Sequence, residues 1–144
     1  MIDIRAQHSV AGRWAHVLFR IFAGAVVFQH GAQKLFGVLG GIDGAGHAAG
    51  VGLTLVGIAG PIEFIGGLLI VLGLFTRPVA LLLSGEMAAA YFLMHFPRGF
   101  WPAVNGGDTP VLLAFGFLYL AATGAGIFSL DYLRTRNRPS SVMR

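Results

Sequence analysis

The chain has 144 residues, of which 56% are hydrophobic and 11% are charged, and its formal net charge is +4. An ordinary soluble domain carries roughly a quarter charged residues, so this composition excludes a typical water-soluble protein and favours the lipid bilayer as solvent. The absence of cysteine excludes disulfides, thiolate metal sites and thiol catalysis. The basic residues do not form one patch, which argues against a nucleic-acid partner.

The apolar segments predict four membrane-spanning helices. A helix that crosses the hydrocarbon core needs about 20 mostly apolar residues. The segments that meet this requirement cover approximately residues 13–36, 51–75, 78–96 and 110–130. Short connections between them predict a single all-α domain, an integral membrane up-and-down four-helix bundle over residues 1–144. A basic tail, residues 131–144, follows the last span, and we expect its final stretch, "RTRNRPSSVMR", to be disordered.

The distribution of Lys and Arg between the predicted loops sets the expected orientation. Most of them lie on the side that carries both termini: Arg5, Arg13, Arg77, Arg134, Arg136, Arg138 and Arg144. The opposite side has Arg98, with Lys34 near its edge. This bias predicts a multi-pass protein with both termini in the cytoplasm. Trp14 and Trp101 then fall at opposite membrane interfaces, where indole rings are common.

Among the ionisable residues of the apolar spans, Arg20, Glu63 and Glu86 lie far from the span ends. Because an unpaired ion in the membrane costs about 3 kcal/mol or more, each of them needs a partner. At about 1.5 Å per residue, Arg20 and Glu86 fall at similar depths. We therefore predict a buried ion-pair network in which Arg20 pairs with Glu86, with Glu63, or with both. The network could fix the register of the helices or form a site that handles protons, and the pattern leaves both interpretations open.

Glycines predict helix interfaces close to these ions. At about 100° per residue, Arg20 and Lys34 lie nearly in line along the first helix, and Gly24 and Gly31 flank that line. Gly66 and Gly67 flank Glu63 in the same way. Small residues let helix backbones approach, so we expect the ions to face the interior of the bundle. The glycine pairs at 66–67 and 124–126 are also candidate contact faces for a homo-oligomer.

A second polar cluster is predicted at the outer end of the bundle. It consists of His30, Lys34, His95, Asn105 and Asp108. Asp108 also stands where a side chain would cap the fourth helix. Two histidines on different helices could ligate a haem, but no further haem signature is visible, and we expect neither haem nor a metal site.

Several motifs together resemble the DoxX family of small bacterial integral membrane proteins. They are "HGAQKLFG" at 30–37, "EFIGGLLIVLGLFTRP" at 63–78, "MHFPRGF" at 94–100 and "NGGD" at 105–108. The resemblance extends over nearly the whole chain. One departure is Asp108, where relatives usually have Glu, and the shorter acid would keep a capping role but reach less far.

The resemblance implies a link to quinone or sulfur redox chemistry in the bacterial inner membrane. Members are similar to the small subunit of thiosulfate:quinone oxidoreductase, and many are described as oxidoreductases. We therefore expect a redox accessory that handles or senses quinone or a reactive-sulfur species, with a soluble or membrane redox enzyme as partner. Whether the chain is itself an enzyme stays open, since no dinucleotide-binding fingerprint is present.

Glu63, His30 and His95 are the candidates for proton and quinone handling. A quinone needs a hydrogen-bond donor for each carbonyl oxygen and a group that exchanges protons, and these residue types supply both. Two other functions are compatible with the sequence. Arg20, Glu63 and Glu86 could form the pathway of a small-solute or proton transporter, and the basic tail could recruit a soluble redox enzyme to a non-catalytic scaffold.

Overall fold

The computed structural model describes residues 9–136, and this part of the chain contains helices and loops but no strand. In chain order the α-helices are α1 (Val10–Phe36), α2 (Leu55–Leu72), α3 (Thr76–Ala90), α4 (Pro102–Asn105), α5 (Asp108–Thr123) and α6 (Leu130–Arg136). Shorter helical turns cover Val38–Gly40, Tyr91–His95 and Phe96–Arg98, and the second of these is π-helical. The all-α prediction is confirmed. Three of the predicted cytoplasmic arginines, Arg5, Arg138 and Arg144, lie outside the described residues.

Local sequence sets the ends of the first two helices. Ser9 and Thr54 each precede a helix and accept a hydrogen bond from the backbone N–H three residues later. These bonds satisfy N–H groups that have no partner within the helix. α1 ends at Gly37 and α2 at Gly73, where φ is 69° and 65°, a left-handed conformation that favours glycine.

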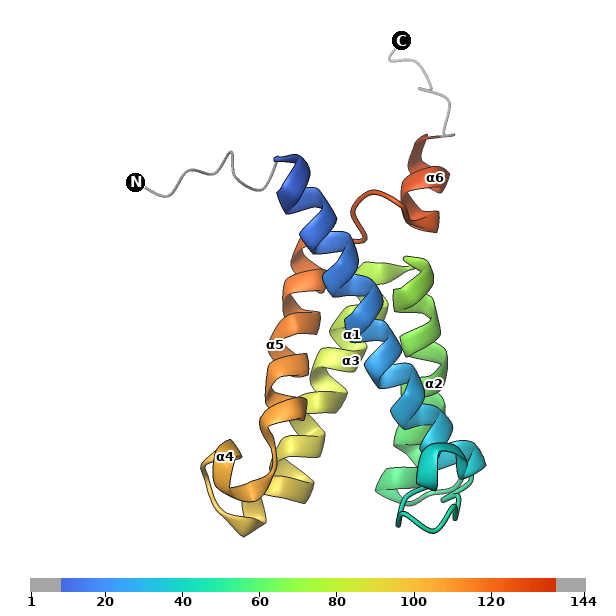
Figure 1. Ribbon diagram of the computed structural model, residues 1–144, viewed down its shortest axis with the longest axis vertical. Helices are drawn as coiled ribbons and strands as arrows, with labels where there is room; N and C mark the ends of the chain where they lie inside the picture. Colours follow the sequence, from blue (N-terminus) through green and yellow to red (C-terminus); the bar gives the residue numbers. More distant parts are fainter. Residues whose placement is uncertain (1–8, 137–144) are drawn as a thin grey trace.

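Three helical segments have the length expected of a membrane span, and a fourth apolar helix, which returns to the end where α1 begins, is shorter (Figure 1). α1, α2 and the helical run Thr76–Arg98 are long and apolar enough to cross a membrane. α5 is also apolar, but it has 16 residues, about 24 Å of helix against a hydrocarbon core of about 30 Å. The predicted fourth span, 110–130, is therefore too long. Gly124 and Gly126 have φ values of 85° and 70°, and they end the helix there.

The predicted basic tail is also partly helical. Its first residues belong to α6, so the expectation of disorder is wrong as far as Arg136. The guanidinium of Arg134 lies 4.6 Å from the centre of the Phe75 ring, which holds α6 against the turn between α2 and α3.

The helices form two antiparallel pairs, α1 with α2 and α3 with α5 (Figure 1). The turn between α2 and α3 joins the pairs at one end of the molecule, where α1 begins and α6 lies. We call this the basic end, because Arg13, Arg77 and Arg134 belong to it. The other end carries the loop of residues 37–54 and α4, and we call it the loop end. The pairs diverge toward the loop end, so the fold is two joined hairpins rather than an evenly packed four-helix bundle.

Glycines allow α1 and α2 to pack with their backbones in contact. A Cβ added to Gly31 would lie 2.6 Å from the Cα of Phe64, and one added to Gly24 would lie 2.9 Å from the carbonyl oxygen of Gly67. The predicted glycine interface of α1 is thus confirmed. Gly66 and Gly67 are themselves buried against other helices of the same chain. They are therefore not available as a contact face for a second copy, which corrects that part of the oligomer prediction.

The distribution of apolar side chains suits a bilayer. A core of fully buried side chains includes Val27, Ile70, Leu83, Phe117 and Leu120. Many other large apolar side chains along the same helices point outward, as in Phe22, Ile65, Leu112 and Phe115. In water such a surface would be a large aggregation-prone patch, whereas in lipid it faces acyl chains.

The α1–α2 contact predicts a specific sensitivity to added volume. We expect Gly31→Ala to lower the unfolding free energy in detergent by about 1–3 kcal/mol, because a backbone cannot give way as a side chain can. Gly85→Ala is the matched control, since a Cβ there meets nothing within 4 Å. Alanine favours the helix by about 1 kcal/mol over glycine, so the control should keep or raise stability. Equal melting curves for the two variants would contradict the close approach.

Candidate functional site

Arg20 is fully buried, but its partners are backbone carbonyls rather than carboxylates. One guanidinium nitrogen, Nη1, donates to the carbonyl oxygens of Ile70 and Val71, each at 2.6 Å. The other, Nη2, donates to the carbonyl oxygen of Phe128 at 2.8 Å. The predicted ion pair between Arg20 and Glu86 or Glu63 is therefore wrong.

The position of Arg20 on α1 explains this outcome. Because α1 and α2 run antiparallel, Arg20 faces the last turn of α2, which ends at Leu72. The last four carbonyls of a helix have no partner within it and carry the negative end of the helix dipole. They are therefore suitable acceptors for a buried cation. Arg20 and Glu86 are predicted to lie at similar depths, but the free carbonyls at the end of α2 are the groups that Arg20 contacts.

Asp131 completes the polar structure at the basic end. Its two carboxylate oxygens accept hydrogen bonds from the backbone N–H groups of Phe75 at 2.9 Å and Thr76 at 2.8 Å. Its own N–H donates to the carbonyl of Gly73 at 2.9 Å. Asp131 thus caps the start of α3 from a distant part of the chain. Sequence analysis missed this role, because a cap that comes from 55 residues away leaves no local pattern.

Glu63 pairs with Lys34 across the α1–α2 interface. Lys34 Nζ lies 2.5 Å from Glu63 Oε1, and the two side chains are 24% and 3% exposed, respectively. Gly60 lies beside Lys34, since a Cβ at Gly60 would be 3.3 Å from the Cβ of Lys34. Lys34, a predicted member of the outer polar cluster, therefore pairs with Glu63 of the predicted buried network.

Glu86 of α3 lies beside this ion pair. Gly66 of α2 faces the side chain of Leu83 of α3. Glu63 precedes Gly66 by three residues on α2, and Glu86 follows Leu83 by three residues on α3. Because the two helices are antiparallel, Glu63 and Glu86 lie at the same level. Glu86 interacts electrostatically with both Glu63 and Lys34. We call Lys34, Glu63 and Glu86 the carboxyl cluster.

The carboxyl cluster has more acids than bases. Within the described residues, Oε2 of Glu63 and Oε2 of Glu86 are buried and have no hydrogen-bond partner. One ammonium group can balance one carboxylate, and a second buried carboxylate at close range is unfavourable. The cluster becomes neutral when the two carboxyl groups hold one proton between them.

The other residues of the predicted outer cluster lie on different hairpins: His30 is on the α1–α2 pair, and His95, Asn105 and Asp108 are on the α3–α5 pair. His30 on α1 bonds through Nδ1 to the side chain of Gln33 at 3.0 Å. His95 is the last residue of the π-helical turn after α3, and its Nδ1 donates to the carbonyl of Asn105 at 3.2 Å. Asp108 is exposed as the first residue of α5, and the capping position before it is Gly107, so the predicted Asp108 cap is wrong. His30, His95 and Glu63 thus bond to different partners, and their roles in proton or quinone handling stay predictions.

The loop between α1 and α2 contains a separate, exposed ion pair. Asp43 Oδ2 lies 2.6 Å from Nδ1 of His47. The hydrogen bond from the Ala45 N–H and then the one from His47 hold the pKa of Asp43 below its usual value. Among residues 9–136 no three His, Cys, Asp or Glu side chains gather as a metal site would require.

The fold and the carboxyl cluster define a small all-α membrane protein whose ionisable groups are buried between apolar helices. Residues 15–96 match the DoxX family model, and this range contains the whole cluster. An uncharacterized protein of Haemophilus influenzae is 41% identical over 115 residues, which cover 78% of this chain and 84% of that protein. A Bacillus subtilis protein named "Putative oxidoreductase CatD" is 30% identical over 115 residues, which cover 80% and 83% of the two chains. The chain belongs to the DoxX family. No solved structure shows a significant match.

A double-mutant cycle can test the observed pairing against the predicted one. Lys34→Met and Glu63→Gln should couple, because each single change leaves the other residue's buried polar group without its partner. We expect an interaction free energy of about 0.5–3 kcal/mol from unfolding in detergent. Arg20→Leu and Glu63→Gln should add to within about 0.5 kcal/mol. Strong coupling in the Arg20 cycle and none in the Lys34 cycle would restore the sequence-based pairing.

Proposed function

We propose that this DoxX-family protein is a redox accessory of the bacterial inner membrane that exchanges a proton with a quinone headgroup through the carboxyl cluster. The proposal includes a multi-pass arrangement with both termini in the cytoplasm, which follows from the arginines of the basic end. The name of the Bacillus subtilis relative supports an oxidoreductase-type role. A reactive-sulfur species is the second substrate class that the family resemblance implies.

The observation that carries the proposal is that buried Glu63 and half-buried Glu86 each have one buried carboxyl oxygen without a hydrogen-bond partner among the described residues, beside Lys34 and among apolar helices. Ionisable groups at such positions are rare, and in membrane proteins they mark proton or substrate pathways. A purely structural ion pair needs only Lys34 and Glu63. The additional carboxyl group of Glu86 raises the energy of the deprotonated cluster and gives it a proton to exchange.

Aromatic side chains beside Glu63 suit a quinone ring. Phe28 and Phe64 stack with their ring centres 4.6 Å apart, and Phe36 packs edge-on against Phe64 at 5.3 Å. Phe36 is 61% exposed on the outer surface of the helix pair, where membrane quinones would approach. Oxidation of a quinol releases two electrons and two protons. In this proposal a partner redox enzyme accepts the two electrons, a carboxylate of the cluster accepts one proton, and the other proton is released to water at the loop end.

A proton transporter is a less suitable function for this geometry. A proton that moved from the carboxyl cluster to the basic end would have to pass the level of Arg20. That arginine is a buried cation held by three carbonyl hydrogen bonds, and a fixed positive charge opposes the passage of protons. The cluster therefore exchanges protons with a substrate or with the loop end more readily than across the whole membrane.

Quinone content and quinone binding test the proposal. The protein is purified in mild detergent, its copurifying quinones are measured by mass spectrometry, and a short-chain quinol analogue is titrated against it. We expect Glu63→Gln and Glu86→Gln to weaken binding at least about tenfold, or about 1.4 kcal/mol. The control is Asp108→Asn, because Asp108 is an exposed acid outside the cluster.

The infrared signal of the carboxyl groups gives a second readout. Reduction of bound quinone should change the carboxyl C=O band in the wild type, and this change should be absent in Glu63→Gln. Unchanged quinone binding in both glutamate variants would reject the proposal. Proton flux through vesicles in the absence of quinone would favour the transporter instead.

A further inference from the structure

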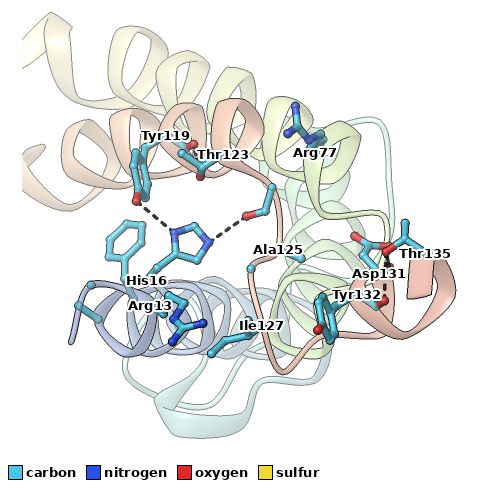
Figure 2. Close-up of a pocket in the computed structure, with 15 residues that line it drawn as sticks. Arg13, His16, Arg77, Tyr119, Thr123, Ala125, Ile127, Asp131, Tyr132 and Thr135 are labelled. Carbon is cyan, nitrogen blue, oxygen red and sulfur yellow. Dashed lines mark hydrogen bonds between the residues drawn. The ribbon is translucent and has the colours of Figure 1, made fainter. Parts of the chain in front are cut away.

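A pocket of about 840 Å³ opens at the basic end (Figure 2). Its lining residues on α1 precede Arg20 in the helix, whereas Lys34 of the carboxyl cluster follows Arg20. The walls of the pocket come from the first turns of α1, the start of α3, the end of α5, the segment 124–127 and α6. A second cavity of about 670 Å³ shares part of its lining, including Arg77 and Asp131, and extends toward Arg134. A volume of this size is typical of small-molecule sites.

The pocket has positive charges that the described part of the chain does not neutralise. Arg13 and Arg77 line it from different walls (Figure 2). Within residues 9–136, neither guanidinium makes a hydrogen bond or an ion pair, in contrast to Arg20 with its three bonds. Asp131 also lines the pocket and keeps its negative charge, but the two arginines outnumber this one carboxylate, and its oxygens already accept hydrogen bonds from the N–H groups of Phe75 and Thr76. The pocket therefore favours an anion.

The wall beside α5 is aromatic and held in a fixed geometry. His16 Nε2 lies 3.0 Å from the carbonyl oxygen of Gly124, which can only accept, so this nitrogen donates. His16 Nδ1 lies 3.1 Å from the hydroxyl of Tyr119 (Figure 2). Phe19 packs edge-on against Tyr119, and Ile127 adds a further apolar surface. A ligand that fits this pocket has an apolar part as well as a negative charge.

We propose that this pocket binds the phosphate group of an anionic amphiphile, with Arg13 and Arg77 on the phosphate oxygens and the aromatic wall on the adjoining apolar part. Guanidinium groups match the geometry of phosphate oxygens and can bind them through two parallel hydrogen bonds. The pocket lies at the start of α1 and the end of α5, where the apolar helices end, and in a bilayer such helix ends lie close to the lipid headgroups. A phospholipid headgroup has this chemistry, and so does a small soluble phosphate ester. The site does not depend on the proposed quinone function.

Lipid binding to three forms of the full-length protein tests the site. They are the wild type, the double variant Arg13→Gln/Arg77→Gln and the control Arg98→Gln. Arg98 lies at the loop end, exposed, and donates to the carbonyl of Met94 in its own turn. Each protein is mixed in maltoside detergent with dioleoyl phosphatidylglycerol, and bound lipid is counted by native mass spectrometry. The melting temperature is measured in parallel, and soluble glycerol 3-phosphate is added in a separate arm.

We expect the double variant to bind phosphatidylglycerol at least about tenfold more weakly than the wild type, and the control to bind it unchanged. The ligand should raise the melting temperature of the wild type and of the control, and not of the double variant. Protection by glycerol 3-phosphate as well would show that the phosphate group is sufficient. Protection by the lipid alone would assign the site to membrane lipid.

Two results would overturn the proposal. One is equal lipid retention by the wild type and the double variant. The other is an equal loss in Arg98→Gln, which would indicate that total charge rather than the pocket decides binding. Because the guanidinium groups of Arg13 and Arg77 make no hydrogen bond or ion pair with the described residues, the double variant should melt at the wild-type temperature without ligand, and this result would confirm that it is folded. Should it melt lower, the single variant Arg77→Gln takes its place in the same comparison.

Discussion

The cost of placing an ion among apolar helices determines how this molecule is built. A charged group in the hydrocarbon region is tolerated only when the protein supplies its partners. The chain meets this requirement in two ways. Arg20 uses backbone carbonyls at the end of α2 and at Phe128, whereas Lys34 uses the carboxylate of Glu63. The first solution fixes three segments of backbone together, and the second leaves spare carboxyl oxygens that can carry chemistry.

The two solutions depend on where each residue meets its neighbouring helix. Arg20 meets a helix end, where free carbonyls are already present. Lys34 meets the middle of α2, where most carbonyls are used within the helix, apart from the one that Pro61 leaves without a donor, and here the carboxylate of Glu63 is the acceptor. Glycines make both contacts possible, since the backbones at Gly24 and Gly31 approach α2 closely enough for side chains to cross the interface. The glycines and the ionisable residues of α1 therefore face the same neighbouring helix, α2.

Much of this arrangement could be predicted from the sequence, and the part that could not has a physical reason. Composition and hydropathy are summed over long segments, so they gave the helical class and the first three apolar helices correctly. The burial of Arg20 and Glu63 followed from the energy of ions in lipid. Their partners did not follow, because a depth estimate locates a residue along the membrane normal but not around it. The carbonyl ligands of Arg20 and the distant cap at Asp131 involve backbone groups, which the sequence does not display.

The two proposed sites differ in how they relate to the family. The family model covers residues 15–96 and hence every residue of the carboxyl cluster. The pocket at the basic end depends on α5, the segment 124–127 and α6, which lie beyond that range. The same segment also supplies the Phe128 carbonyl that satisfies Arg20, so the pocket wall and the buried arginine share one stretch of backbone. The family match therefore includes the three residues of the carboxyl cluster, whereas the pocket draws much of its lining from residues beyond the matched range.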